Sequence, residues 1–438
     1  MPLKLEAALR ALPDAPVLAG LRETLISLAR ARRAASWAVA GEYETLERRE
    51  AELEGLAGRL QELAEQARER TERIHRHSLE ALQALEQGDP AAAARALVAA
   101  GEVLEANREL EEAESFFRQA VQLGRKPRDR SAQALAHCRL ARVLRARGSW
   151  PQALREYRTG WEVAEAERAR DLMVLACQGC GNVHVDLGEW SLAREWYLRG
   201  LEVLAGSPPG RAEWELCSNL SIVARRSGSL AESEGWLLRA AQTAGALGDE
   251  EVEFFVANGW GQLHLARGDP RAAEESFRQA LGATRHPHSR AATFVNLGES
   301  LLLQGRLDDA EQVAREAEET ALLHRVLTLL PDAYRLLGRV AGERGQRDGF
   351  VFFEQALALE GENGPARSRA ETQHRYGEFQ ARMGDTDSAA ARLREAAGVY
   401  RALGAARELE GVEAALAELG GTTERTPAEA GFAQESER

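Results

Sequence analysis

The sequence predicts an all-α fold: a right-handed helical solenoid of about eight antiparallel helix-pair repeats with an N-terminal helical cap. Three observations predict it. Glycines suited to turns recur every 37 to 40 residues, a small residue stands seven positions before each of them, and a small–bulky–small pattern follows each. A period of this length is typical of one repeat array rather than several separate domains.

The turns between paired helices are the first repeating feature. Seven glycines mark them, and Arg108 takes the equivalent place in the first unit: Gly148, Gly188, Gly228, Gly268, Gly305, Gly345 and Gly384. The small residues seven positions earlier are Gly101, Ala141, Gly181, Ser221, Gly261, Gly298, Gly338 and Gly377. We expect each turn residue to end the first helix with a positive φ, and a proline such as Pro270 to begin the second.

The second helix of each unit carries three further columns. The first column is small: Ala113, Ala153, Ala193, Ser233, Ala273, Ala310, Gly349 and Ala389. Four residues later the side chain is bulky in seven of eight units: Phe117, Tyr157, Tyr197, Leu237, Phe277, Ala314, Phe353 and Leu393. The third is small again: Ala120, Gly160, Gly200, Ala240, Ala280, Ala317, Ala356 and Ala396. Small residues let two helices approach closely, and the bulky side chain fills the gap between them.

This arrangement resembles the tetratricopeptide repeat family over roughly residues 90 to 400. The units are about 40 residues long rather than 34, and most lack the family's closing proline. Longer units of this kind are similar to those of kinesin light chains and of bacterial peptide sensors. The resemblance implies that the first helices form a concave face that binds extended peptides.

The chain outside the array divides into three segments. We expect an N-terminal helical cap or coiled-coil hairpin at 1–89, the array at 90–403, a C-terminal capping helix at 404–419 and a disordered tail at 420–438. Within the first segment, two helices are expected to fold back on each other about Gly41. The second of them carries a heptad stripe: Leu46, Leu53, Leu60, Ala67, Ile74 and Ala81. The stripe favours capping of the first repeat, and homodimerisation through these helices is the alternative.

Charge and composition exclude several classes of protein. The 56 basic and 69 acidic residues give a net charge of -13, which opposes binding to nucleic acid or to anionic lipid. No apolar run reaches the roughly 18 residues of a membrane-spanning helix. The four cysteines and the absence of a secretory signal indicate a reduced, cytoplasmic protein.

Enzymatic motifs are absent from the sequence. It contains no HExxH, GxSxG or GxxxxGK[ST], and its lysines are only Lys4 and Lys126. We therefore expect no catalytic residue, no enzymatic activity and no cofactor.

Cys177, Cys180 and His184 fall on one face of a predicted helix, and Cys217 stands at the position equivalent to Cys177 in the next repeat. Four such ligands could hold zinc. These are core columns: the column of Cys180 holds leucine or tryptophan in other units, and cysteine packs as a small hydrophobe. Packing is therefore favoured over metal binding.

The predicted concave face is rich in amides and arginines. The proposed peptide-binding residues are Arg142, Gln178, Asn182, Asn219, Asn258, Gln262, Asn296, Arg335 and Arg339. Ile222, Glu299, His374 and Glu378 stand in the same columns. An amide can donate to and accept from a peptide backbone, and arginine can bind a carboxylate with two hydrogen bonds.

These residues predict a protein–protein interaction scaffold that binds an extended peptide or partner segment. A peptide-responsive regulatory sensor that acts on transcription or signalling partners is the alternative function. A structural alternative also stays open, in which the amides only bridge neighbouring helices.

Overall fold

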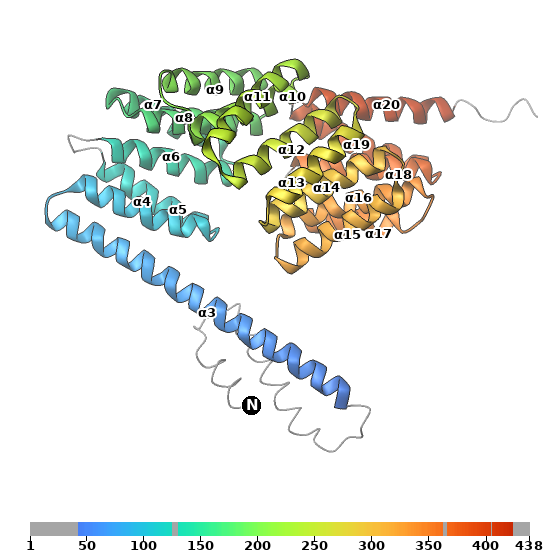
Figure 1. Cartoon of the computed structure of the whole chain (residues 1–438), viewed down its shortest axis with the longest axis horizontal. Helices are drawn as coiled ribbons and strands as arrows, with labels where there is room; N and C mark the ends of the chain where they lie inside the picture. The colour runs from blue at the N-terminus through green and yellow to red at the C-terminus, as the bar shows by residue number, and fades with distance from the viewer. Residues whose placement is uncertain (1–42, 125–129, 362–365, 404, 424–438) are drawn as a thin grey trace, which may run out of the picture. The chain divides into compact units, whose positions relative to one another are not determined.

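The computed structural model describes residues 43–124, 130–361, 366–403 and 405–423 (Figure 1). These residues form eighteen α-helices and one short 3-10 helix, with no strand among them. The all-α prediction is confirmed. The chain forms two compact units, Met1–Ala169 and Arg170–Arg438, so it divides inside the predicted array, and each unit is described by itself.

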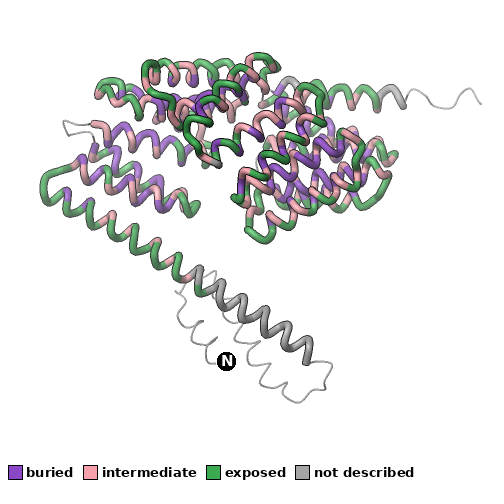
Figure 2. The backbone as a smooth tube through the Cα atoms, viewed as in Figure 1, coloured by how far each residue is buried: buried purple, intermediate pink, exposed green. Residues whose placement is uncertain are grey.

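The first unit consists of one long helix followed by two helix pairs. Its helices are α3 (Tyr43–Glu86), α4 (Pro90–Ala106), α5 (Leu110–Leu123), α6 (Ser131–Ala146) and α7 (Trp150–Ala166). The end of α3 packs on α4 and buries Ala81 and Ala84, whereas much of the rest of its described surface is exposed (Figure 2). The expected helix before Gly41 lies outside the described residues. Dimerisation through the heptad stripe stays a prediction.

The second unit contains six further helix pairs and a final single helix. Its helices are α8 (Arg170–Asp186), α9 (Trp190–Leu204), α10 (Arg211–Arg226), α11 (Leu230–Leu247), α12 (Glu250–Ala266), α13 (Pro270–Ala283), α14 (Pro287–Leu303), α15 (Leu307–Leu323), η1 (Leu327–Leu329), α16 (Leu330–Glu343), α17 (Gly349–Glu360), α18 (Ala366–Arg382), α19 (Thr386–Ala402) and α20 (Ala406–Thr423). With α4/α5 and α6/α7 this makes eight pairs, the number that the sequence predicts.

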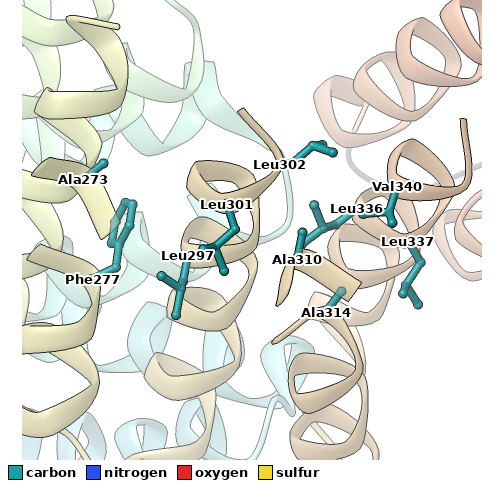
Figure 3. Close-up of a cluster of buried hydrophobic side chains, with 10 residues drawn as sticks. All are labelled: Ala273, Phe277, Leu297, Leu301, Leu302, Ala310, Ala314, Leu336, Leu337 and Val340. Carbon is teal, nitrogen blue, oxygen red and sulfur yellow. The ribbon is translucent and has the colours of Figure 1, made fainter. Parts of the chain in front are cut away.

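The predicted packing columns are buried. Among the bulky residues, Phe117, Phe277 and Phe353 have no exposed surface. A Cβ added to Gly101 would lie 2.6 Å from the Phe117 ring, so the small residue makes room for the bulky one. Figure 3 shows the cluster of buried apolar side chains in α13–α16 to which Phe277, Leu297 and Leu301 belong.

The turns between paired helices also have the predicted geometry. Gly268 has a φ of 78°, and Arg108 adopts 65° in the unit that lacks the glycine. Pro270 occupies the start of α13, and the side chain of Asp269 accepts a hydrogen bond of 3.1 Å from the backbone N–H of Ala272.

In the second unit, the first helices of the pairs lie on the inner side of the curved array. Consecutive first helices, from α8 through α10, α12, α14 and α16 to α18, come within 8 Å of one another between Cα atoms. Among the described residues, consecutive second helices do not. In a curved stack the more closely spaced layer lies inside. The first helices therefore form the concave face, as expected.

The final helix, α20, covers the exposed side of the last pair. Val412 is fully buried against a cluster that includes Leu393 and Tyr400. The helix continues to Thr423, past Gly420 and Gly421, whereas the sequence predicted its end at Leu419. Glycine has a low helix propensity, which is why the sequence suggested an earlier end. None of the described helices is long and apolar enough to span a membrane.

Candidate functional site

The inner face carries most of the predicted groove residues at half-buried positions. Arg142 belongs to the first unit and is exposed on α6. Its guanidinium donates a hydrogen bond of 2.5 Å to Glu105 Oε2 on α4. It therefore joins two neighbouring first helices.

Several predicted residues of the second unit also bridge neighbouring helices. Gln178 Nε2 on α8 donates to Glu215 Oε2 on α10 at 2.8 Å, and Asn296 Nδ2 on α14 donates to Asn258 Oδ1 on α12 at 3.2 Å. Gln262 Oε1 accepts from Arg225 on α10 at 2.5 Å. Asn182 Oδ1 accepts from the hydroxyl of Tyr197 within its own pair at 2.6 Å. These side chains therefore already have hydrogen-bond partners within the protein, as expected if they hold neighbouring helices together.

The two predicted arginines of α16 differ from each other. Arg335 is only 9% exposed, and its guanidinium donates to Glu360, Ser368 and Thr372 at 3.0 to 3.2 Å. Arg335 thus ties α16 to α17 and α18 and is not open to a ligand. Arg339 pairs with Glu299 on α14 and keeps part of its side chain in solvent.

Asn219 on α10 is the exception among the predicted amides. Asn219 is half-buried, and its side-chain amide forms no hydrogen bond with any other residue in the described part of the chain. One turn away on α10, Ile222 is 41% exposed, and on α12 Phe255 is 43% exposed at the position three residues before Asn258. This part of the inner face therefore combines an amide with uncovered apolar surface.

Two cavities open farther along the inner face of the second unit. The smaller, of about 210 Å³, lies over α14, α16 and α18 and is lined by Leu303 and Arg339 among others. The larger, of about 900 Å³, is lined by residues of α10, α18, α19 and α20, by the α10–α11 turn and by Trp190 at the start of α9. Arg375 and Glu378 line both cavities, so the two lie next to each other.

Charged side chains dominate the wall that the cavities share. Glu378 Oε2 lies 3.0 Å from Arg375, and its Oε1 lies 3.3 Å from His374 Nε2. Burial raises the pKa of Glu378, but His374 and Arg375 outweigh burial and lower that pKa to about 2. Glu378 is therefore an anion at neutral pH.

The larger cavity brings together residues that are far apart in sequence. Arg226 at the end of α10 lies 3.4 Å from Glu408 Oε1 on α20, and Arg367 on α18 donates to the same oxygen. Their positions in the repeat predict that His374 and Glu378 lie on the inner face. No local pattern relates Arg226 to Glu408, because curvature of the array brings them together.

The four cysteines are buried, and none of them forms a disulfide. Burial raises the pKa of the Cys217 thiol to about 11, which disfavours the thiolate needed to bind a metal. His184 Nδ1 lies 2.6 Å from Glu189 Oε2. Within the described ranges, no three cysteine, histidine or carboxylate side chains are grouped closely enough to hold a metal ion.

Comparison with known families agrees with this geometry. A model described as "Tetratricopeptide repeat-like domain" matches residues 31–211, and one described as "Tetratricopeptide repeat" matches residues 258–322. The chain is a tetratricopeptide-like repeat protein. No curated protein matches the sequence.

Solved structures of other tetratricopeptide-like proteins share the fold. The apo form of the quorum sensor NprR from B. thuringiensis is 11% identical with a TM-score of 0.55, and the match covers 75% of this chain and 98% of that one. The Rap conjugation gene regulator of the plasmid pLS20, in complex with the Phr* peptide, is 12% identical with a TM-score of 0.50. That match covers 77% of this chain and 97% of the regulator. At these identities the likeness concerns the fold alone.

Proposed function

We propose that this repeat protein is a non-enzymatic, cytoplasmic scaffold that binds an extended peptide, or an extended segment of a partner protein, on the inner face of its second unit. The observation that carries the proposal is the unpaired amide of Asn219 beside exposed Ile222 and Phe255. An amide can pair with a peptide backbone, while the apolar side chains supply contact area.

A regulatory sensor is the second candidate. The two structural neighbours are described as a quorum sensor and as a gene regulator bound to a peptide, which supports a peptide ligand that controls another protein. Both candidates place the peptide on the same face. They differ in whether binding changes the array's interaction with a further partner.

The test compares two asparagines of the inner face. A synthetic pool of random peptides of about ten residues is passed over immobilised protein, and the retained fraction and the melting temperature are measured for Asn219→Ala and Asn258→Ala. For Asn219→Ala we expect weaker retention, by about fivefold for the loss of one hydrogen bond worth about 1 kcal/mol. Its melting temperature should stay at the wild-type value, because the amide has no partner within the described protein.

Asn258→Ala is the matched control. It removes the acceptor of Asn296 between α12 and α14, so its melting temperature should fall. A pool retained equally by wild type and Asn219→Ala would contradict the proposal. A lower melting temperature for Asn219→Ala with unchanged retention would contradict it too, since the amide would then be structural.

A further inference from the structure

The last helices of the second unit come back to its first helices. The carbonyl oxygen of Leu403, just after α19, lies so close to the α8–α9 turn that a Cβ on Gly188 would be 2.6 Å from it. The guanidinium of Arg367 on α18 lies 6.0 Å from the centroid of the Trp190 ring at the start of α9. The two ends of the second unit therefore meet, and the larger cavity lies between them.

An ion pair adds a third contact between these ends. Arg226 at the end of α10 lies 3.4 Å from Glu408 Oε1 on α20, and the two side chains are 44% and 29% exposed. Burial raises the pKa of Glu408, but Arg367, a backbone hydrogen bond and Arg226 outweigh burial and lower that pKa. Glu408 is therefore an anion at neutral pH, and salt screens its attraction to Arg226 because the pair is partly in solvent.

These contacts form a thin interface. In the described part of the chain, no Cα atom of helices α18–α20 comes within 8 Å of a Cα atom of helices α8–α10. The cavity of about 900 Å³ lies between them instead. Close-packed interiors have few voids larger than a water molecule, so much of the two facing surfaces lacks van der Waals contact. An exposed ion pair shifts an equilibrium by about fivefold at most, so the closure is weak.

The seat of α20 on α19 is of a different kind. Val412 is fully buried in a cluster with Leu393 and Tyr400, and Leu409 and Leu416 pack against that cluster. Apolar burial of this extent stabilises far more than one exposed ion pair does. If the two ends separate, α20 therefore stays with α18 and α19.

We propose that the second unit is a ring that opens and closes between these two ends, and that the Arg226–Glu408 pair is its latch. Opening moves α18–α20 away from α8–α10 as one body and exposes the larger cavity. Each repeat contacts only its neighbours, so small changes of angle at the intervening repeats add up to this movement. The inference goes beyond the proposed function, because the movement needs no bound peptide.

The experiment measures the distance between the two ends in the full chain without ligand. Spin labels are attached to Ser229→Cys, beside the end of α10, and to Ala414→Cys on α20, two exposed positions that do not line the cavity. The four native cysteines are buried and should stay unlabelled. Pulsed electron paramagnetic resonance of the frozen protein should show a short and a long distance, which correspond to the closed and the open ring.

Arg226→Gln should raise the ratio of open to closed ring by about threefold to fivefold. It removes the latch and leaves the pair of Glu408 with Arg367 in place. Sodium chloride at about 1 M should shift the wild-type ratio in the same direction, since salt screens an exposed pair.

Arg401→Gln is the matched control. Arg401 is also exposed and pairs with a carboxylate of α20, Glu413, but it lies on the neighbouring helix α19. Its loss should therefore leave the ratio of open to closed ring unchanged. Melting temperatures of all variants establish that each one folds.

Three results would overturn the inference. The first is a distance distribution that neither Arg226→Gln nor salt changes, and the second is an equal change in Arg401→Gln. A second pair of labels, on Ala391→Cys of α19 and Ala414→Cys, should keep one distance throughout. The third result is a longer distance for this pair in the open population, because α20 would then be leaving α19 instead of moving with it. None of these results bears on Asn219, so the proposed function is tested separately.

Discussion

At the scale of single residues, the array depends on pairs of one small and one bulky side chain. Gly261 on α12 is such a position, because an added Cβ would overlap the ring of Phe277 on α13. The ring is fully buried and surrounded by other apolar side chains, so it cannot move aside without opening the packing between the helices. The glycine is therefore required by its neighbour, not by its own backbone.

We predict that Gly261→Leu lowers the free energy of unfolding by about 1 to 3 kcal/mol or more, as overpacked cores do. Thermal and urea denaturation measure it. Gly235→Leu is the matched control, since Gly235 lies within α11 with no atom near its missing Cβ. There leucine should be neutral or stabilise by up to about 1 kcal/mol through helix propensity. Equal effects of the two substitutions would show that helix α12 does not pack on Phe277 as described.

At the scale of helices, Arg335 shows how a polar side chain can be structural on the face that we propose to bind a peptide. Its guanidinium holds Glu360 at the end of α17 and Thr372 on α18. We predict that Arg335→Gln costs about 3 to 5 kcal/mol, because it leaves the buried carboxylate of Glu360 without its cation. Arg339→Gln, one turn further along α16, should cost closer to about 1 kcal/mol, since its pair with Glu299 is partly solvated.

Chemical denaturation of the two variants measures this difference. If Arg335→Gln unfolds at the same urea concentration as Arg339→Gln, the network around Arg335 contributes little to stability. In that case the arginine would be available to a ligand, as the sequence first suggested.

The sequence could predict the helices but only part of the site. Turn glycines such as Gly268 and bulky residues such as Phe277 act on neighbours within one repeat, so their periodic spacing is visible in the chain. Whether an inner-face side chain forms a hydrogen bond depends on the residue that the next repeat places beside it. Asn258 accepts a hydrogen bond from Asn296 of the next repeat, whereas the side chain of Asn219 has no hydrogen-bond partner in the described protein. Such pairing depends on side-chain lengths and helix offsets that vary between repeats, so a column of residue types does not reveal it.

At the scale of the whole molecule, a repeat array needs its last apolar face covered. In the second unit α20 does this: it buries Val412 and partly buries Leu409 and Leu416 against α19. A repeat that contacts only its neighbours loses stability locally when such a cap is removed. The ion pair of Glu408 with Arg226 on α10 adds a contact that a purely sequential stack would lack, whereas the pair of Glu408 with Arg367 joins the neighbouring helices α18 and α20.

Removal of residues 406–438 should therefore have two effects. Stability should fall by several kcal/mol, because each buried apolar side chain contributes about 1.5 to 3 kcal/mol. Hydrogen exchange should become faster in α18 and α19, which lose the cap, and also at the end of α10, which loses the partner of Arg226. Removal of residues 424–438 alone is the control and should leave exchange in all three helices unchanged. Faster exchange in α18 and α19 with an unaffected α10 would mean that the Arg226–Glu408 pair does not hold α20 across the cavity, because a strictly sequential array transmits the loss of its cap only to the adjacent repeat.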